Sequence, residues 1–128
     1  MSVLIIEDEE IVAHTLKQLL KIRYNTKVTT AETVQIARQT LRNESFDLLI
    51  VDYNLPDGTG YGLLCELASE LEWLTETTLI FVSGVSYVDL TPEFRDSVKI
   101  FKNLHVRNKP MSADDLYQIA DLVLPSST

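Results

Sequence analysis

The chain has very little cysteine and no long apolar run, and each of these shortages excludes a class of protein. Cys65 is the single cysteine among 128 residues, so an internal disulfide is excluded. No apolar stretch approaches the roughly 20 residues that a membrane-spanning helix needs, so we expect no membrane association. The first residues, Ser2 to Ile6, lack the basic segment of a signal peptide. Together these features predict a cytoplasmic protein with one core.

Basic residues are also in short supply. The chain carries 11 Lys and Arg against 19 Asp and Glu, which gives a net charge of −8. Direct binding of this domain to nucleic acid is therefore not expected, because such binding requires Lys and Arg opposite the phosphates. The acidic excess suits a cation or a basic partner surface, and it also keeps a domain in solution.

The most informative stretch is FDLLIVDYNLPDGTG, residues 46–60. Its unbroken apolar run, Leu48 to Val51, is typical of a strand buried on both faces. The run ends at Asp52, and turn-forming residues follow. We therefore expect Asp52 at the carboxyl end of a central strand, where open α/β sheets bind their ligands.

Short apolar runs alternate along the chain with segments whose apolar residues recur at helical spacing. The pattern predicts a flavodoxin-like, doubly wound α/β fold with a five-stranded parallel sheet, order 2-1-3-4-5, and helices on both faces. We expect a single domain over residues 1–124 and a polar tail or linker stub at 125–128. The expected strands are residues 2–6, 25–30, 48–51, 78–82 and 104–108, and the expected helices are 11–22, 32–43, 60–71, 93–103 and the segment from Ser112, its cap, to Pro125.

Polar residues follow or end four of these strands: Glu7 and Asp8, Asp52, Ser83 and Lys109. Because parallel strands end at the same edge of a sheet, we expect these side chains to converge. Three neighbouring carboxylates would repel one another, and a divalent cation resolves that repulsion. Mg²⁺ is a hard ion that takes oxygen ligands, so the cluster predicts a magnesium site.

The same cluster suits phosphoryl transfer. An ionised carboxylate such as Asp52 can attack phosphorus and form an acyl phosphate without the help of a base. Mg²⁺ and the ammonium of Lys109 would neutralise the transferred group, and the hydroxyl of Ser83 could donate a hydrogen bond to it.

Four motifs in order, each at a strand end, resemble the receiver domains of two-component response regulators, of the chemotaxis-regulator type. They are Leu4–Glu9, Asp52–Gly60, Val82–Gly84 and Asn108–Pro110. The resemblance covers essentially the whole chain.

The resemblance implies a metal site and a partner. Asp52 is similar to the phosphoacceptor that takes its phosphoryl group from a histidine kinase or phosphotransfer protein. Asp8, Asp52 and the backbone carbonyl of Asn54 match the ligands of Mg²⁺, and Glu7 matches the acid that reaches the metal through water.

The resemblance also implies a switch. Ser83 and Lys109 match the hydroxyl and the lysine that contact the phosphoryl group, and the bond before Pro110 is expected to be cis. Phosphorylation would change binding to a downstream output domain or protein. The chain would then not be an enzyme, because it would catalyse only its own phosphorylation and dephosphorylation.

Two positions depart from the family pattern. Glu7 stands where Asp is commoner, and Val106 stands where receivers usually carry Tyr or Phe. Gly84 leaves little side chain beside the phosphoryl site, which predicts easy access of water and a short-lived phosphoryl state. The approach from Gly84 to Pro92 is also longer than expected.

Two alternatives remain open. One is a pseudo-receiver, a binding module that is never phosphorylated, which Val106 favours. The other is a phosphatase of the haloacid-dehalogenase type, which usually has a second Asp two residues after the nucleophile, where this chain has Asn54. Turnover of a small phosphate ester would identify the phosphatase.

Overall fold

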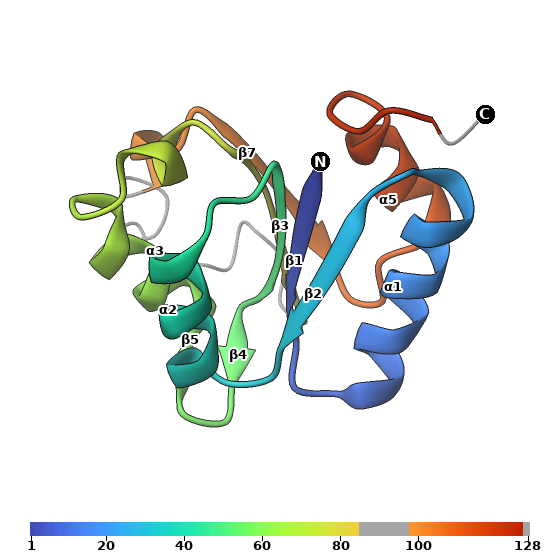
Figure 1. Cartoon of the computed structure of the whole chain (residues 1–128). Coiled ribbons are helices and arrows are strands. Elements are labelled where there is room, and N and C mark those ends of the chain that lie inside the picture. The colour runs from blue at the N-terminus through green and yellow to red at the C-terminus, as the bar shows by residue number, and fades with distance from the viewer. Residues whose placement is uncertain (85–97, 127–128) are drawn as a thin grey trace.

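The computed structural model describes residues 1–84 and 98–126, and in them a five-stranded parallel sheet forms the centre of the molecule (Figure 1). The strand order is β2-β1-β3-β6-β7, which is 2-1-3-4-5 when the strands of this sheet are counted along the chain, so the predicted fold is confirmed. The strands are β1 (Ser2–Ile6), β2 (Lys27–Ala31), β3 (Leu48–Asp52), β6 (Thr78–Ser83) and β7 (Asn103–Asn108).

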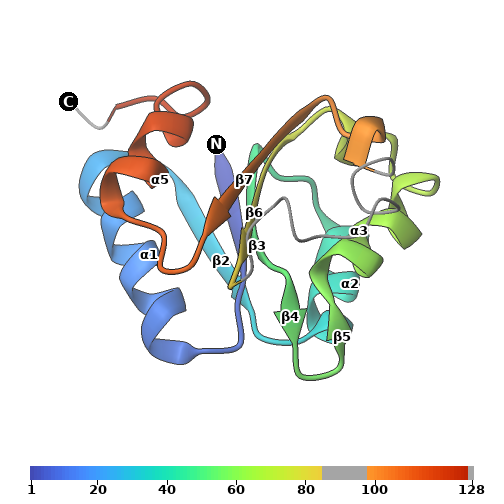
Figure 2. The ribbon, with the colours of Figure 1, turned by 180° about the vertical axis from the view of Figure 1, so that it is seen from behind.

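Helices cover both faces of the sheet. Helices α1 and α5 lie on one face and α2 and α3 on the other, as the two opposite views show (Figures 1 and 2). None of the helices in the described ranges is long and apolar enough to cross a membrane. The α-helices are α1 (Glu10–Arg23), α2 (Val34–Asn43), α3 (Gly60–Ala68) and α5 (Ala113–Ala120), and the 3-10 turns are η1 (Glu72–Thr75) and η3 (Val98–Ile100).

The core has two layers because side chains alternate along each buried strand. In β3, Leu49 and Val51 pack toward α2 and α3, while Leu48 and Ile50 pack toward α1 and α5. All five residues of β3 are buried, as expected for a central parallel strand that helices cover on both faces.

Two helix ends differ from the prediction. The expected helix over residues 60–71 ends at Ala68, and the chain continues into η1, whose Leu74 is fully buried. The last helix ends at Ala120 and not near Pro125, because the amides of Leu122 and Val123 bond to carbonyls three residues back, which tightens the turn. Its predicted cap is confirmed: the amide of Asp115 donates to Ser112 Oγ at 3.0 Å.

The helix expected over residues 93–103 is only partly testable. Residues 85–97, and with them most of the segment from Gly84 to Pro92, lie outside the described residues. The prediction is wrong for the end of the segment, because Asn103 already belongs to β7 and pairs in register with Thr78. The side-chain amide of Asn103 also donates to the carbonyl of Glu76 at 2.8 Å, which fixes the start of the strand.

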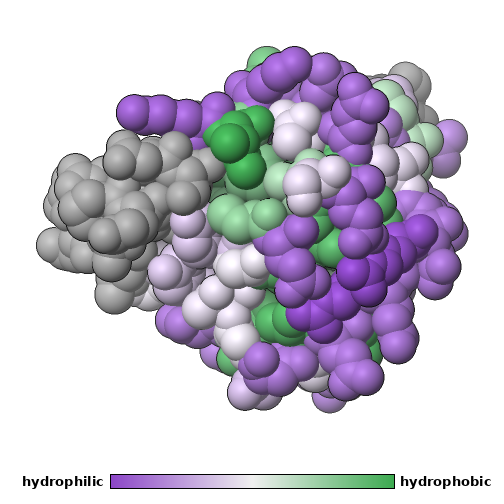
Figure 3. All heavy atoms as spheres, turned by 90° about the vertical axis from the view of Figure 1, so that its left-hand side faces the viewer, coloured by the Kyte–Doolittle hydropathy of each residue, from purple (hydrophilic) through white to green (hydrophobic). Residues whose placement is uncertain are grey.

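Hydrophilic residues gather on the right of the described surface in Figure 3, and residues of intermediate to high hydropathy lie between them and the grey atoms. Two ion pairs join α2 to α3 and to the turn that follows it, Arg38 to Glu66 and Arg42 to Glu70, each at 2.7 Å. Each guanidinium donates two hydrogen bonds to its carboxylate. Pairs this exposed contribute little to the stability of the fold, because solvent and salt screen their charges.

Candidate functional site

The carboxyl ends of the parallel strands bring the expected polar residues to one edge of the sheet. Glu7 directly follows β1, Asp52 ends β3, Ser83 ends β6 and Lys109 directly follows β7. Glu7, Asp52 and Ser83 are 5%, 5% and 1% exposed, so these polar side chains lie in the protein interior. Such burial of carboxylates is costly unless other groups compensate their charge.

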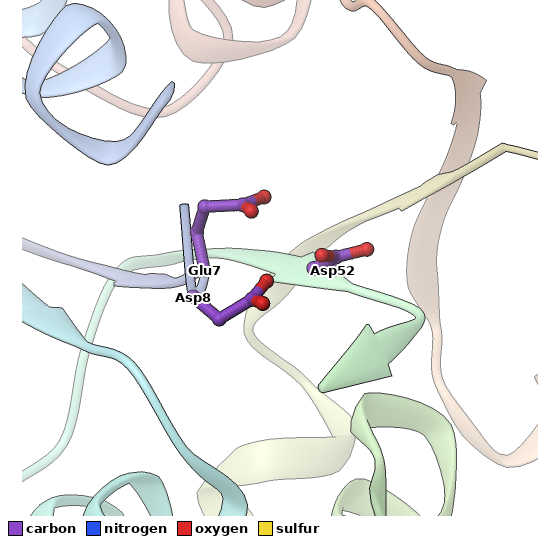
Figure 4. A group of neighbouring side chains, drawn as sticks. All are labelled: Glu7, Asp8 and Asp52. Carbon is purple, nitrogen blue, oxygen red and sulfur yellow. The ribbon is translucent and has the colours of Figure 1, made fainter. Parts of the chain in front are cut away.

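Three carboxylates converge at this edge. Glu7, Asp8 and Asp52 each offer a carboxylate oxygen within 4.8 Å of the others. Glu7 and Asp8 project from the end of β1 toward the end of β3, where Asp52 lies (Figure 4). Asp8 is exposed, which leaves the cluster open on that side. The donors are all oxygen atoms and the charge is concentrated, so the pocket fits a hard divalent cation.

Lys109 neutralises part of this charge. Its Nζ donates a hydrogen bond to Asp52 Oδ2 at 2.9 Å and lies 3.4 Å from Glu7 Oε2. Partial burial by itself lowers the pKa of Lys109, but the hydrogen bond to Asp52 and the charges of Asp52 and Glu7 raise it above the ordinary value. The ammonium therefore stays charged beside Asp52 at neutral pH.

Glu7 is the most perturbed acid of the site. Burial raises the pKa of Glu7 to about 7, and the charge of Asp52 adds to the increase. The amide of Glu9, which donates to Glu7 Oε1 at 3.1 Å, and the charge of Lys109 oppose it. Without a metal ion, Glu7 therefore exchanges its proton near neutral pH.

Glu9 is a site residue that the sequence patterns do not single out. Its carboxylate lies 3.9 Å from Lys109 Nζ, at the rim of the site, and its amide holds Glu7. The signal was the run of four acids from Glu7 to Glu10, in which any member could face either the site or the solvent. The geometry of the β1–α1 turn decides which ones face the site.

Backbone hydrogen bonds fix the loop that follows Asp52. The amide of Asn54 donates to Asp52 Oδ1 at 3.3 Å, and the amide of Tyr53 donates to the carbonyl of Val82 at 2.9 Å. Gly60 begins α3 beside this strand end, and its amide donates to the carbonyl of Tyr53 at 2.9 Å. A Cβ at position 60 would overlap the carbonyl oxygen of Asp52, so this close approach requires glycine.

The loop also contains a small hairpin, β4 (Asn54–Leu55) and β5 (Gly58–Thr59), that the sequence patterns do not predict. Asp57 at its tip accepts hydrogen bonds from the amides of Val34 and Gln35, at 2.7 and 3.1 Å. These amides belong to the first turn of α2, so the loop after Asp52 is tied to that helix end. The carbonyl of Asn54 in β4 stays a predicted metal ligand.

Two further features concern the residues that the resemblance assigns to a switch. The amide of Lys109 donates to the carbonyl of Ser83 at 2.8 Å, and the bond between Lys109 and Pro110 is cis, as the resemblance implies. Val106 is half-buried in β7 and packs against the core on the α2–α3 side, so no aromatic ring occupies this position.

Comparison with protein families gives a match over residues 3–121 to the response regulator receiver domain. Among curated proteins, the two-component response regulator ORR8 of Oryza sativa subsp. indica is 38% identical over 66 residues, which is 51% of this chain and 54% of that protein. The two-component response regulator ORR12 of Oryza sativa subsp. japonica is 36% identical over the same length. The matched part thus spans about half the length of these relatives.

Solved structures show the same fold. The signal receiver domain of a putative Luxo repressor protein from Vibrio parahaemolyticus is 26% identical with a TM-score of 0.79, over 94% of this chain and 87% of that one. A CheY-like receiver domain protein from Methanospirillum hungatei JF-1 is 23% identical with a TM-score of 0.77, over 94% and 90%. At that identity the second likeness concerns the fold alone.

Proposed function

The chain belongs to the family of response regulator receiver domains, and from this premise we propose that Asp52 accepts a phosphoryl group in a Mg²⁺-dependent reaction. The observation that carries the proposal is the position of Lys109. Its ammonium lies 2.9 Å from Asp52 and 3.4 Å from Glu7, two members of the cluster of three carboxylates. A cation held at that place can stabilise the negative charge of a phosphoryl group that is transferred to Asp52.

The residues of the chain supply positioning and charge. One oxygen of the ionised Asp52 attacks phosphorus and forms a P–O bond, while the bond from phosphorus to the donor breaks and the donor keeps its electron pair. The ammonium of Lys109, beside Asp52, would neutralise negative charge on the new phosphoryl oxygens. The hydroxyl of Ser83, at the end of β6, would donate a hydrogen bond to one of these oxygens.

Glu7, Asp8 and Asp52, with the backbone carbonyl of Asn54, would hold the Mg²⁺ ion, Glu7 through water. When bound, the ion supplies positive charge for the transferring oxygens. The all-oxygen donor set and the exposed side at Asp8 support this assignment, because Mg²⁺ keeps part of its water shell.

Receiver domains generally act between a kinase or phosphotransfer protein and an output domain. For this chain we propose that a histidine kinase or phosphotransfer protein supplies the phosphoryl group in the cytoplasm and that phosphorylation alters binding to an output domain or protein. The domain acts on its own Asp52 and not on a separate substrate. We place it at residues 1–124, with 125–128 as a tail or linker stub.

The proposal is tested by intact-protein mass after incubation with acetyl phosphate, with and without Mg²⁺. We expect a gain of one phosphoryl group that requires Mg²⁺ and is lost in Asp52→Asn. The matched control is Asp47→Asn, just before the amino end of the same strand, which keeps an acceptor for the amide of Ser2. Failure of the wild type to gain mass although it binds Mg²⁺ would favour the pseudo-receiver, the reading that Val106 supports.

A further inference from the structure

A cavity of about 430 Å³ adjoins the site on the α1–α5 face of the sheet. Helix α1 forms one wall, β3 and β6 lie beneath it, and the residues that follow β7 form the other wall. Figures 1 and 2 show α1 and α5 side by side over this face. The volume falls within the roughly 300–1,000 Å³ of pockets that bind small molecules.

Most of the cavity is apolar. Its walls carry Val12, Leu16 and Leu19 from α1 and Met111 after β7, above Ile50 and Val82 of the sheet. Val12, Leu19 and Met111 are only partly buried, although they pack against the core of this face. Covering apolar surface that the protein itself leaves exposed is favourable, so an apolar ligand body would be stabilised here.

One end of the cavity carries charged groups whose net charge is negative. Glu7, Glu9 and Asp52 contribute three carboxylates there, against the single ammonium of Lys109. Glu7 and Asp52 are each 5% exposed, so solvent screens them weakly. The uncompensated negative charge disfavours an anionic ligand and complements a cation.

We propose that this cavity binds a small organic cation with an apolar body, of the alkylammonium or arylalkylammonium class. The cationic head lies at Glu7 and Glu9, and the apolar body extends along α1 toward Leu19. The head uses a carboxylate that we also assign to the metal site, so the ligand and Mg²⁺ compete. This competition rests on the proposed function, whereas binding to the metal-free chain does not.

The two methionines give a direct readout of binding. Met111 lines the cavity, whereas Met1 is 59% exposed at the other end of β1 and acts as an internal control. The full chain with ¹³C-labelled methionine methyl groups is titrated with n-octylammonium without Mg²⁺. We expect a saturable shift of the Met111 signal and no shift of Met1.

Three comparisons then locate the ligand. The probes n-octanoate and n-octanol keep the apolar body without the positive charge, and we expect them to bind at least about tenfold more weakly. Val12→Phe fills the cavity and should abolish the Met111 shift. The control Val123→Phe enlarges another partly buried residue of the same core cluster that does not line the cavity. Circular dichroism establishes that each variant is folded.

Mg²⁺ provides the last comparison. We expect added Mg²⁺ to weaken n-octylammonium binding in proportion to the occupancy of the metal site, which is measured separately by calorimetry. Equal binding of the three probes or retained binding in folded Val12→Phe would overturn the proposal. Binding that saturating Mg²⁺ leaves unchanged would overturn the competition alone, and with it the shared carboxylate. Loss of phosphorylation in an Asp52 variant would not overturn the proposal, because the titration is done on the unphosphorylated chain.

Discussion

Lys109 Nζ lies 3.4 Å from Glu7 Oε2, so the acid at the end of β1 pairs with the lysine that follows β7. The family pattern more often has Asp at position 7, and the extra methylene of glutamate lengthens its reach toward Lys109. Lys109 is thus shared between Glu7 and Asp52, which is 2.9 Å away. The two buried carboxylates therefore pair with the same ammonium.

Lys109→Gln should slow phosphorylation of Asp52 by acetyl phosphate by on the order of 10²-fold, because it removes a fixed charge at the transferring group. The initial rate is measured from intact masses at saturating Mg²⁺. Lys102→Gln is the control, since Lys102 also pairs with a carboxylate, Glu76 at 2.8 Å, but on an exposed surface. Equal phosphorylation rates in the two variants would show that Lys109 does not contribute to the reaction.

The stability of the metal-free protein should depend on the ionisation of Glu7. Burial raises the pKa of Glu7 from its ordinary 4.5 to about 7 in the folded chain, so the folded state binds more protons than the unfolded state between these values. The stability that protonated Glu7 contributes is complete below 4.5 and is lost as the pH rises through about 7.

The measurement is the free energy of unfolding by urea in the presence of a chelator, at about pH 5 and about pH 8. Wild type should lose on the order of 1–3 kcal/mol more than Glu7→Gln over this interval. Saturating Mg²⁺ should reduce the difference, because the ion favours the ionised carboxylates. The same pH dependence in both proteins would show that Glu7 does not titrate in this range.

Gly60→Ala should destabilise the fold by on the order of 2–4 kcal/mol, because its Cβ would overlap Val51 and the backbone of Asp52. Gly84→Ala is the matched control, since a Cβ there meets no atom of the described residues within 4 Å. Thermal unfolding of the two variants gives the comparison. A Gly60→Ala protein as stable as wild type would mean that the start of α3 does not approach Asp52 so closely.

A larger side chain at position 84 should lengthen the lifetime of the phosphoryl group. Gly84 is exposed directly after buried Ser83, and none of the described residues would contact a Cβ there, which leaves room for water. We expect Gly84→Leu to slow the loss of the phosphoryl group several-fold, with Gly84→Ala between it and wild type. The decay is followed by intact mass after the donor is removed, and an unchanged or faster decay in Gly84→Leu would contradict the idea.

The sequence predicts the strands and helix caps around the site well, because these elements depend on local sequence patterns. The apolar run before Asp52 predicts a buried strand that ends at a carboxylate, and β3 does end at Asp52. The cap at Ser112 also depends on neighbours in the sequence, and the hydrogen bond from the amide of Asp115 confirms it. Parallel strand ends then bring Glu7 and Lys109 to the same edge.

What the sequence does not predict depends on contacts between distant segments. The pairing of Glu7 with Lys109 joins residues from the ends of β1 and β7, and only the folded sheet brings them to 3.4 Å. The hydrogen bonds from α2 to Asp57 likewise require the hairpin after Asp52 to reach the amide of Val34. The cavity beside the site arises from the gap between α1 and Met111, which no local pattern encodes.

The central claim is that Asp52 forms an acyl phosphate, and the most direct test is to locate that bond. The phosphorylated chain is treated with borohydride, which reduces an acyl phosphate to an alcohol and leaves free carboxylates unchanged, and peptides are then sequenced by mass spectrometry. The account predicts one reduced side chain, at position 52, which appears only when both donor and Mg²⁺ were present. Reduction at another carboxylate, or a phosphoryl group that is retained after treatment, would contradict it.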